Sequence, residues 1–80
     1  MEAEYTKRAA KAIKGMESPT KQRIRTAINN IPKGDIKPLR GEDGAYRLRV
    51  GDWRIVFTYP NADTVKIDKI APRGQVYKEM

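Results

Sequence analysis

Residues 46–57 read YRLRVGDWRIVF, in which apolar and polar side chains alternate on both sides of a central Gly51-Asp52 pair. Alternation with a period of two is typical of β-strands that bury one face. A glycine at the first central position of a two-residue loop favours a type II′ turn. The stretch therefore predicts a β-hairpin, two antiparallel strands joined by a tight turn.

The two-residue turn also predicts which residues lie opposite each other. The expected pairs are Val50–Trp53, Arg49–Arg54, Leu48–Ile55, Arg47–Val56 and Tyr46–Phe57. One face then carries Tyr46, Leu48, Val50, Trp53, Ile55 and Phe57, and it should be covered by helices. The other face carries Arg47, Arg49 and Arg54.

The expected Arg49–Arg54 pair points to an anionic partner. Like charges directly opposite each other destabilise a sheet, so selection for folding alone would avoid this pair. A guanidinium group stays charged and binds phosphate through two parallel hydrogen bonds. We therefore interpret the arginines as phosphate contacts; the alternative is an ordinary solvated face with the arginines splayed into water.

Upstream of the hairpin, the apolar spacing changes from strand to helix. Residues 1–5 alternate and predict a short strand, after which Thr6 is a candidate helix N-cap. Helical spacing follows twice, with Gly15 ending the first helix and Ser18-Pro19 expected as N-cap and first residue of the second. The apolar positions are Ala9, Ala12, Ile13 and Met16, then Ile24, Ala27, Ile28 and Ile31.

Downstream and between these elements, turns and a third strand are expected. Residues 32–44 are punctuated by Gly and Pro and predict a connecting segment. Residues 64–70 predict a third strand, in which Lys66 and Asp68 join the arginines if Val65 and Ile67 face the core. Residues 69–70 break the alternation and indicate an edge or a bulge.

This order of elements predicts an α+β fold. It comprises a short N-terminal strand, a two-helix hairpin and an antiparallel β-meander, with the helices packed on one sheet face. The chain has 80 residues, which is the size of a single domain with a small core.

Composition limits the chemistry that the chain can perform. There are 17 Lys and Arg against 10 Asp and Glu, for a net charge of +7, which favours a polyanionic partner. There is no cysteine and no histidine, so the usual general base and the commonest metal ligands are missing. The chain shows neither a long apolar run nor a signal-peptide core, and we expect a cytoplasmic protein.

The positive charge is concentrated in the helical half. Residues 1–40 hold ten Lys and Arg and four Asp and Glu, whereas residues 41–80 hold seven and six. The helix lysines could grip a second phosphate surface, or they could simply be the solvated sides of two helices. The role of Tyr77 is also left open. Its position fits core packing better than stacking on a base, as aromatic rings do in proteins that bind single strands.

Several segments taken together resemble the RelE family of toxins. They are Leu39-Arg40-Gly41, the hairpin at residues 46–57 and Arg73-Gly74-Gln75-Val76-Tyr77. The opening Tyr5-Thr6-Lys7-Arg8-Ala9 and the helix pair are also similar to the family. The resemblance spans essentially the whole chain and implies a single RelE-like toxin domain over residues 1–80.

The resemblance implies a function that the residue patterns alone do not show. RelE toxins are ribosome-dependent endonucleases that cut mRNA in the A site without a metal or other cofactor. A cognate antitoxin, here RelB-like or similar, holds them inactive. The implied partners are therefore this antitoxin, the ribosome and mRNA, with no membrane.

The resemblance also implies site residues. By position, the catalytic residues are Arg47, Arg49, Arg54, Arg73 and Tyr77, which would promote attack of a ribose 2′-hydroxyl on the adjacent phosphate. Further contacts to RNA or the ribosome are expected at Lys7, Lys11, Lys14, Arg40, Lys66 and Lys78.

The chain departs from the family at the two basic positions of the first hairpin strand. Relatives often have lysines where this chain has Arg47 and Arg49. The pKa of arginine is too high for an easy general base, which favours electrostatic roles there. Two alternative functions are inhibition of DNA gyrase, as in the related ParE branch, and RNA binding without catalysis.

Overall fold

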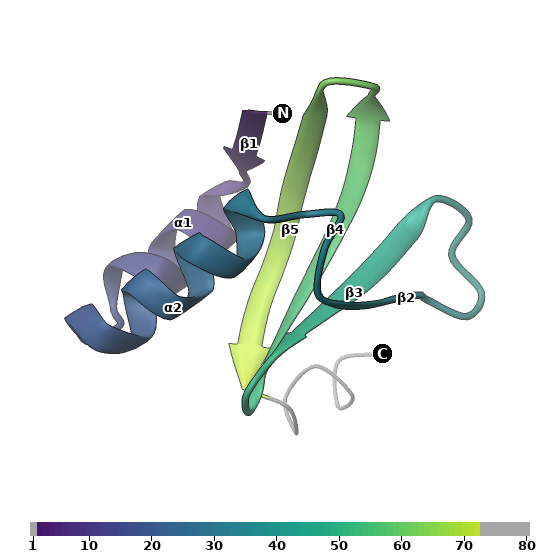
Figure 1. Cartoon of the computed structure of the whole chain (residues 1–80). Coiled ribbons are helices and arrows are strands. Elements are labelled where there is room, and N and C mark those ends of the chain that lie inside the picture. The colour runs from purple at the N-terminus through teal and green to yellow at the C-terminus, as the bar shows by residue number, and fades with distance from the viewer. Residues whose placement is uncertain (1, 73–80) are drawn as a thin grey trace.

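The computed structural model describes residues 2–72 as two helices and a five-stranded sheet (Figure 1). The order of elements is β1 (Glu2–Tyr5), α1 (Lys7–Lys14), α2 (Ser18–Asn29), β2 (Asp35–Pro38), β3 (Ala45–Val50), β4 (Trp53–Asn61) and β5 (Thr64–Pro72). The strands lie in the order β1-β5-β4-β3-β2. Strand β1 is parallel to β5, and the other neighbours are antiparallel.

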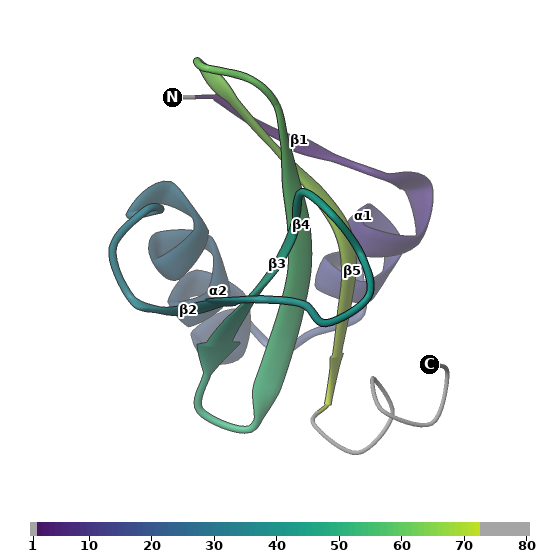
Figure 2. The same cartoon turned by 90° about the vertical axis from the view of Figure 1, so that its right-hand side faces the viewer.

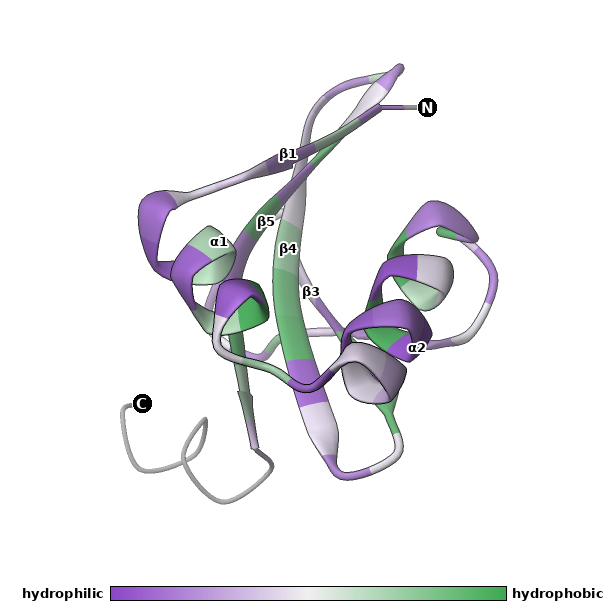
Figure 3. Ribbon diagram, turned by 90° about the vertical axis from the view of Figure 1, so that its left-hand side faces the viewer, coloured by the Kyte–Doolittle hydropathy of each residue, from purple (hydrophilic) through white to green (hydrophobic). Residues whose placement is uncertain are grey.

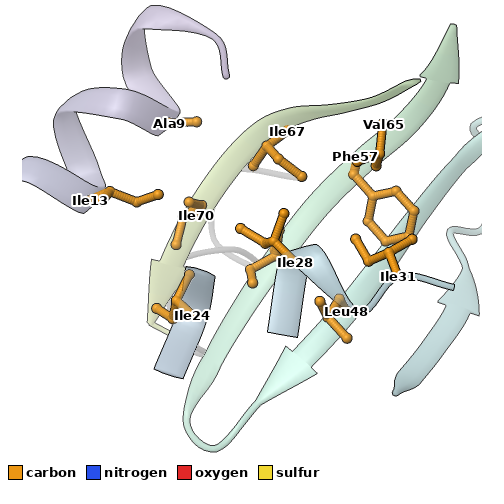
Figure 4. Packing of buried hydrophobic residues seen from close by; sticks show 11 residues of the cluster. Ala9, Ile13, Ile24, Ile28, Ile31, Leu48, Phe57, Val65, Ile67 and Ile70 are labelled. Carbon is orange, nitrogen blue, oxygen red and sulfur yellow. The ribbon is translucent and has the colours of Figure 1, made fainter. Parts of the chain in front are cut away.

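Both helices cover the same face of the sheet (Figure 3). Helix α1 packs mainly against β5, whereas α2 contacts β3 and β1. Apolar side chains from both helices meet those of the three central strands (Figure 4). The fully buried members with the largest side chains are Phe57, Ile24, Ile28, Leu48, Ile55, Ile67 and Val65. The predicted α+β architecture is confirmed.

The hairpin between β3 and β4 has the expected register. All five predicted pairs are present, including Arg49 opposite Arg54. Gly51 has a φ of 59°, and Asp52 does not have a positive φ. This combination is that of a type II′ turn, which only a residue without a Cβ adopts readily at the first central position.

Thr6 joins the start of α1 to β5. Its hydroxyl oxygen accepts a hydrogen bond from the Ala9 backbone N–H at 3.2 Å, as expected of an N-cap. The same hydroxyl donates to the Asp68 carbonyl oxygen at 2.8 Å. The Arg8 Nε–H donates to that carbonyl as well, at 2.8 Å. Two side chains at the start of α1 therefore hold one backbone carbonyl of β5.

A bulge interrupts β5 where the alternation of the sequence fails. Val56 pairs with Lys69 while the next residue, Phe57, pairs with Ile67, so Asp68 is an additional residue in β5. The extra residue shifts the alternation by one position. Ile70 therefore turns into the core, where it is 5% exposed. The interpretation of residues 69–70 as a bulge is confirmed.

Three expectations about local structure were wrong. Ser18 is the first residue of α2, Pro19 is the second, and the N-cap is Glu17, whose side chain makes no capping hydrogen bond. The expected connecting segment contains β2, because a four-residue strand in which only Ile36 is partly buried gives too short an alternation to recognise. Strand β5 continues to Pro72.

Replacing Thr6 by alanine should lower the free energy of unfolding by about 1–2 kcal/mol, because the N-cap acceptor and the donor to Asp68 are both lost. Thr6→Ser keeps the hydroxyl and is the matched control, which should stay within about 0.5 kcal/mol of the wild type. Urea unfolding measures both. Equal stability of the alanine and serine variants would contradict this account of the α1–β5 junction.

Candidate functional site

The sheet face opposite the helices collects most of the expected site residues. Figure 2 views the sheet from this side, with the helices behind it. Strand register places Arg47, Arg49, Arg54 and Val56 of β3 and β4 here, flanked by Asp35 and Lys37 on β2 and by Lys66, Lys69 and Ala71 on β5. We call this surface the arginine face.

The arginines on this face are largely withdrawn from solvent. Arg47 is 9% exposed and Arg54 is 5% exposed, and Arg49 is half-buried. Within residues 2–72, the buried Nε of Arg49 has no hydrogen-bond partner. Arginine is rarely buried unless it is paired, and desolvated guanidinium groups interact strongly with an anion that reaches them.

Asp35 on β2 forms an ion pair with Arg47 on the neighbouring strand β3. The Arg47 Nη1 lies 3.3 Å from the Asp35 Oδ1, and it also donates to the Asp35 carbonyl oxygen at 3.2 Å. This interaction orients the guanidinium along the sheet. Asp35 was not expected at this site from the sequence, although the polar–apolar–polar order of Asp35, Ile36 and Lys37 could have indicated it.

Charge on this face is arranged with cations at the centre and acids at the edges. On β3 and β4, the charged residues of the face are Arg47, Arg49 and Arg54. Two acidic residues lie on this face in the edge strands. Asp35 of β2 pairs with Arg49, and Glu4 of β1 pairs with Lys66 of β5. A phosphate group approaching the centre therefore meets positive charge.

Lys69 joins the same face although the sequence analysis did not place it there. It lies opposite Val56, which in turn lies opposite Arg47. Burial lowers the pKa of Lys69 below its ordinary value of 10.5, and the positive charge of Arg8 lowers it further. A lowered pKa increases the fraction of neutral amine at a given pH, and the neutral amine is the form that can accept a proton.

The remaining expected residues are not gathered with the arginines. Lys7, Lys11 and Lys14 are exposed on α1, on the helical side of the sheet. Arg40 is exposed in the turn between β2 and β3. Arg73, Tyr77 and Lys78 lie outside residues 2–72.

Lys14 lines a separate hollow of about 300 Å³ between the two helices. The other polar residues that line this hollow are Tyr5, Lys21 and Arg25, and its apolar lining includes Ile13. Burial raises the pKa of the Tyr5 phenol, and Arg25 partly opposes that effect. Lys14 and Lys21 thus border a basic hollow distinct from the arginine face.

Sequence comparison with protein families matches residues 3–77 to the ParE toxin of type II toxin–antitoxin system, parDE. The chain belongs to the RelE/ParE family of toxins. The match covers both helices and the sheet from Ala3 onward, so it includes every residue that forms the arginine face. A comparison with curated proteins gave no match.

Solved structures of toxin–antitoxin complexes have the same fold as this RelE/ParE toxin. The RelB–RelE complex from Methanococcus jannaschii matches with 27% identity and a TM-score of 0.77, covering 96% of this chain and 98% of the other. The archaeal RelE–RelB complex from Pyrococcus horikoshii OT3 matches with 27% identity and a TM-score of 0.71, covering 92% and 96%. The E. coli DinJ–YafQ complex, at 16% identity and a TM-score of 0.68 over 94% of each chain, shares the fold.

Neither helix within residues 2–72 is long and apolar enough to span a membrane. The same part of the chain contains no group of three or more acidic side chains arranged to hold a metal ion.

Replacing Arg49 by glutamine should weaken the salt dependence of RNA binding. For a single-stranded 2′-O-methyl RNA, the slope of log K against log salt should fall in magnitude by about 0.7, the value for one phosphate contact. Arg23→Gln is the matched control, because Arg23 is exposed on α2 on the helical side. Fluorescence anisotropy over a salt series measures both slopes. An equal reduction in the two variants would contradict phosphate binding by the arginine face.

Proposed function

We propose that this toxin is a ribosome-dependent endoribonuclease that cleaves mRNA in the A site without a metal ion. The observation that carries the proposal is the pairing of Arg49 with Arg54 at the centre of a cationic sheet face. Like charges so placed weaken the sheet unless an anion lies between them. A phosphodiester supplies that anion, and its charge and geometry suit guanidinium groups.

The comparisons support the same choice of substrate. The two solved relatives with 27% identity are RelE proteins, and the resemblance in the sequence is to RelE toxins, which cut mRNA on the ribosome. The family relationship supports a type II toxin, and the arginine face supports RNA rather than a protein as its target.

The proposed reaction is attack of a ribose 2′-oxygen on the adjacent phosphorus atom. The 2′-oxygen to phosphorus bond forms as the bond from phosphorus to the 5′-oxygen breaks, which leaves a 2′,3′-cyclic phosphate and a 5′-hydroxyl. Negative charge accumulates on the non-bridging oxygens, and positioned guanidinium groups stabilise it. Arg54 is the main phosphate clamp in this proposal, supported by Arg47 and Arg49.

Two further residues enter the proposal from the resemblance to RelE toxins alone. Arg73 would lie beside the leaving 5′-oxygen, and Tyr77 would stack on a base or assist proton transfer. Arg40, Lys66, Lys78 and the α1 lysines would contact the RNA backbone or the ribosome. Of these, Lys66 lies opposite Glu4, so its expected contribution is the weakest.

A RelB-like antitoxin is the proposed inhibitor. The solved RelE relatives are complexes with RelB. An acidic, amphipathic segment that folds on binding would cover apolar surface and neutralise part of the arginine face. Addition of the purified cognate antitoxin should therefore abolish cleavage.

Inhibition of DNA gyrase is the second candidate, because the matching family description names the ParE toxin. Gyrase inhibition needs no phosphate site, and the buried arginines would then have no function of their own. An assay of gyrase supercoiling alongside mRNA cleavage separates the two candidates.

Primer extension on mRNA held in translating ribosomes tests the proposed function. Wild-type toxin should cut within the A-site codon. Arg54→Ala should reduce the rate by about 100-fold to 1,000-fold, as expected when one donor to the transition-state charge is lost. Arg54→Lys keeps the charge without the bidentate geometry, so its cleavage rate should lie between those of the wild type and Arg54→Ala.

Unfolding curves for the Arg54 variants must accompany the rates, because Arg54 is buried. Near-wild-type cleavage by both Arg54→Ala and Tyr77→Phe would refute the assigned roles. Intact mRNA together with inhibited supercoiling would favour the gyrase candidate, and intact mRNA with salt-dependent RNA binding would favour a binding-only protein.

A further inference from the structure

The β5 bulge determines the face on which Lys69 lies. Without the additional residue, strict alternation from Ile67 would turn Lys69 toward the helices and the core. With Asp68 inserted, Lys69 lies opposite Val56 on the arginine face, and Ile70 takes the core position. Bulges are frequent beside active sites, where they re-aim a side chain.

The bulge is held in place by the start of α1. The Asp68 carbonyl oxygen accepts hydrogen bonds from the Thr6 hydroxyl and the Arg8 Nε–H, each at 2.8 Å. The Thr6 backbone N–H also donates to the Ile67 carbonyl oxygen at 3.0 Å. Three hydrogen bonds therefore fix the backbone next to Lys69 and limit the directions that its side chain can take.

Strand register places Lys69 in the same region of the arginine face as Arg47 and Arg54. Val56 separates Lys69 from Arg47 in one row across the strands, and Arg54 is a diagonal neighbour of Lys69 because it pairs with Ala71. Neighbouring strands lie about 4.8 Å apart. Two long side chains that are two strands apart can therefore contact the same phosphodiester above Val56.

The groups around Lys69 favour its neutral form. Among the described residues, Arg8 from α1 acts electrostatically on Lys69. Strand register places Arg54 of β4 and Arg47 of β3 on the same face, with Lys66 and Asp68 on β5 itself and Glu4 on β1 opposite Lys66. Burial and the charge of Arg8 both lower the pKa of Lys69. A lower pKa increases the fraction of neutral amine near pH 7, and only the neutral amine accepts a proton.

We propose that Lys69, turned onto the arginine face by the bulge at Asp68, is the catalytic proton acceptor for the ribose 2′-hydroxyl. This inference rests on the proposed RNA cleavage. It assigns the proton-transfer role to β5, since the basic residues of the hairpin are all arginines and remain charged.

Lys69 takes part in one proton transfer as the ribose 2′-oxygen attacks phosphorus. The neutral Lys69 Nζ takes the proton of the 2′-hydroxyl as the 2′-oxygen bonds to phosphorus. The bond from phosphorus to the 5′-oxygen breaks, and that oxygen takes a proton from water. The Lys69 ammonium then releases its proton to solvent, which restores the neutral amine. No oxidant, reductant or cofactor takes part.

Single-turnover cleavage on programmed ribosomes tests this role with four proteins: wild type, Lys69→Met, Lys69→Arg and Lys33→Met. Lys69→Met should be slower by about 100-fold or more, the usual contribution of a general base. Lys69→Arg should be equally slow, because arginine keeps the positive charge but does not release its proton. Lys33 is exposed in the turn before β2, and its variant should cleave at the wild-type rate.

Chemical rescue supplies a readout that a structural role would not move. Methylamine should restore cleavage to Lys69→Ala, and the rescued rate should increase with the concentration of the free-base form of the amine. Lys33→Ala and Arg54→Ala should not respond. Urea unfolding of each variant shows whether its fold is intact.

The possible outcomes distinguish failure of the role of Lys69 from failure of the proposed function. Active Lys69→Arg would show that only the charge matters and would overturn the proton-acceptor role, as would wild-type rates in a folded Lys69→Met. Failure of methylamine to rescue a folded Lys69→Ala would also overturn it. A wild-type toxin that leaves ribosome-bound mRNA intact would overturn the proposed function and the role of Lys69 together.

Discussion

The two-residue turn at Gly51-Asp52 sets the register of the central hairpin, and the distribution of charge over the sheet depends on that register. A slip of β3 by one residue would turn its arginines toward the helices and expose Leu48. Burial of Phe57 and its neighbours against both helices therefore fixes the position of the arginines as well. The apolar core and the cationic face are two consequences of one pairing pattern.

The cationic face has an energetic consequence for a domain of this size. Arginines opposite each other and partly desolvated oppose folding, whereas a chain of 80 residues has only a small core to offset them. A ligand that binds the folded state alone shifts the equilibrium toward it. In the proposed function, RNA phosphate and an acidic antitoxin segment would each provide such stabilisation at the arginine face.

Features set by local sequence could be predicted, and features set by long-range pairing could not. The hairpin register, its type II′ turn and the Thr6 cap each follow from a few adjacent residues, and the structure confirms them. Strand β2 gains its stability from pairing with β3 rather than from its own four residues. Asp35 therefore went unrecognised as the partner of Arg47. Lys69 could not be placed because the position of a bulge depends on hydrogen bonds from α1, about 60 residues away in the chain.

The central claim is that the arginine face holds the scissile phosphate of RNA. A structure of the toxin on a ribosome carrying a 2′-O-methyl A-site codon, which binds without being cleaved, tests it most directly. The account predicts the scissile phosphate within hydrogen-bond distance of the Arg54 guanidinium, above Val56 and between Arg47 and Lys69. A toxin bound through its helices, with the arginine face turned away from the mRNA, would contradict it.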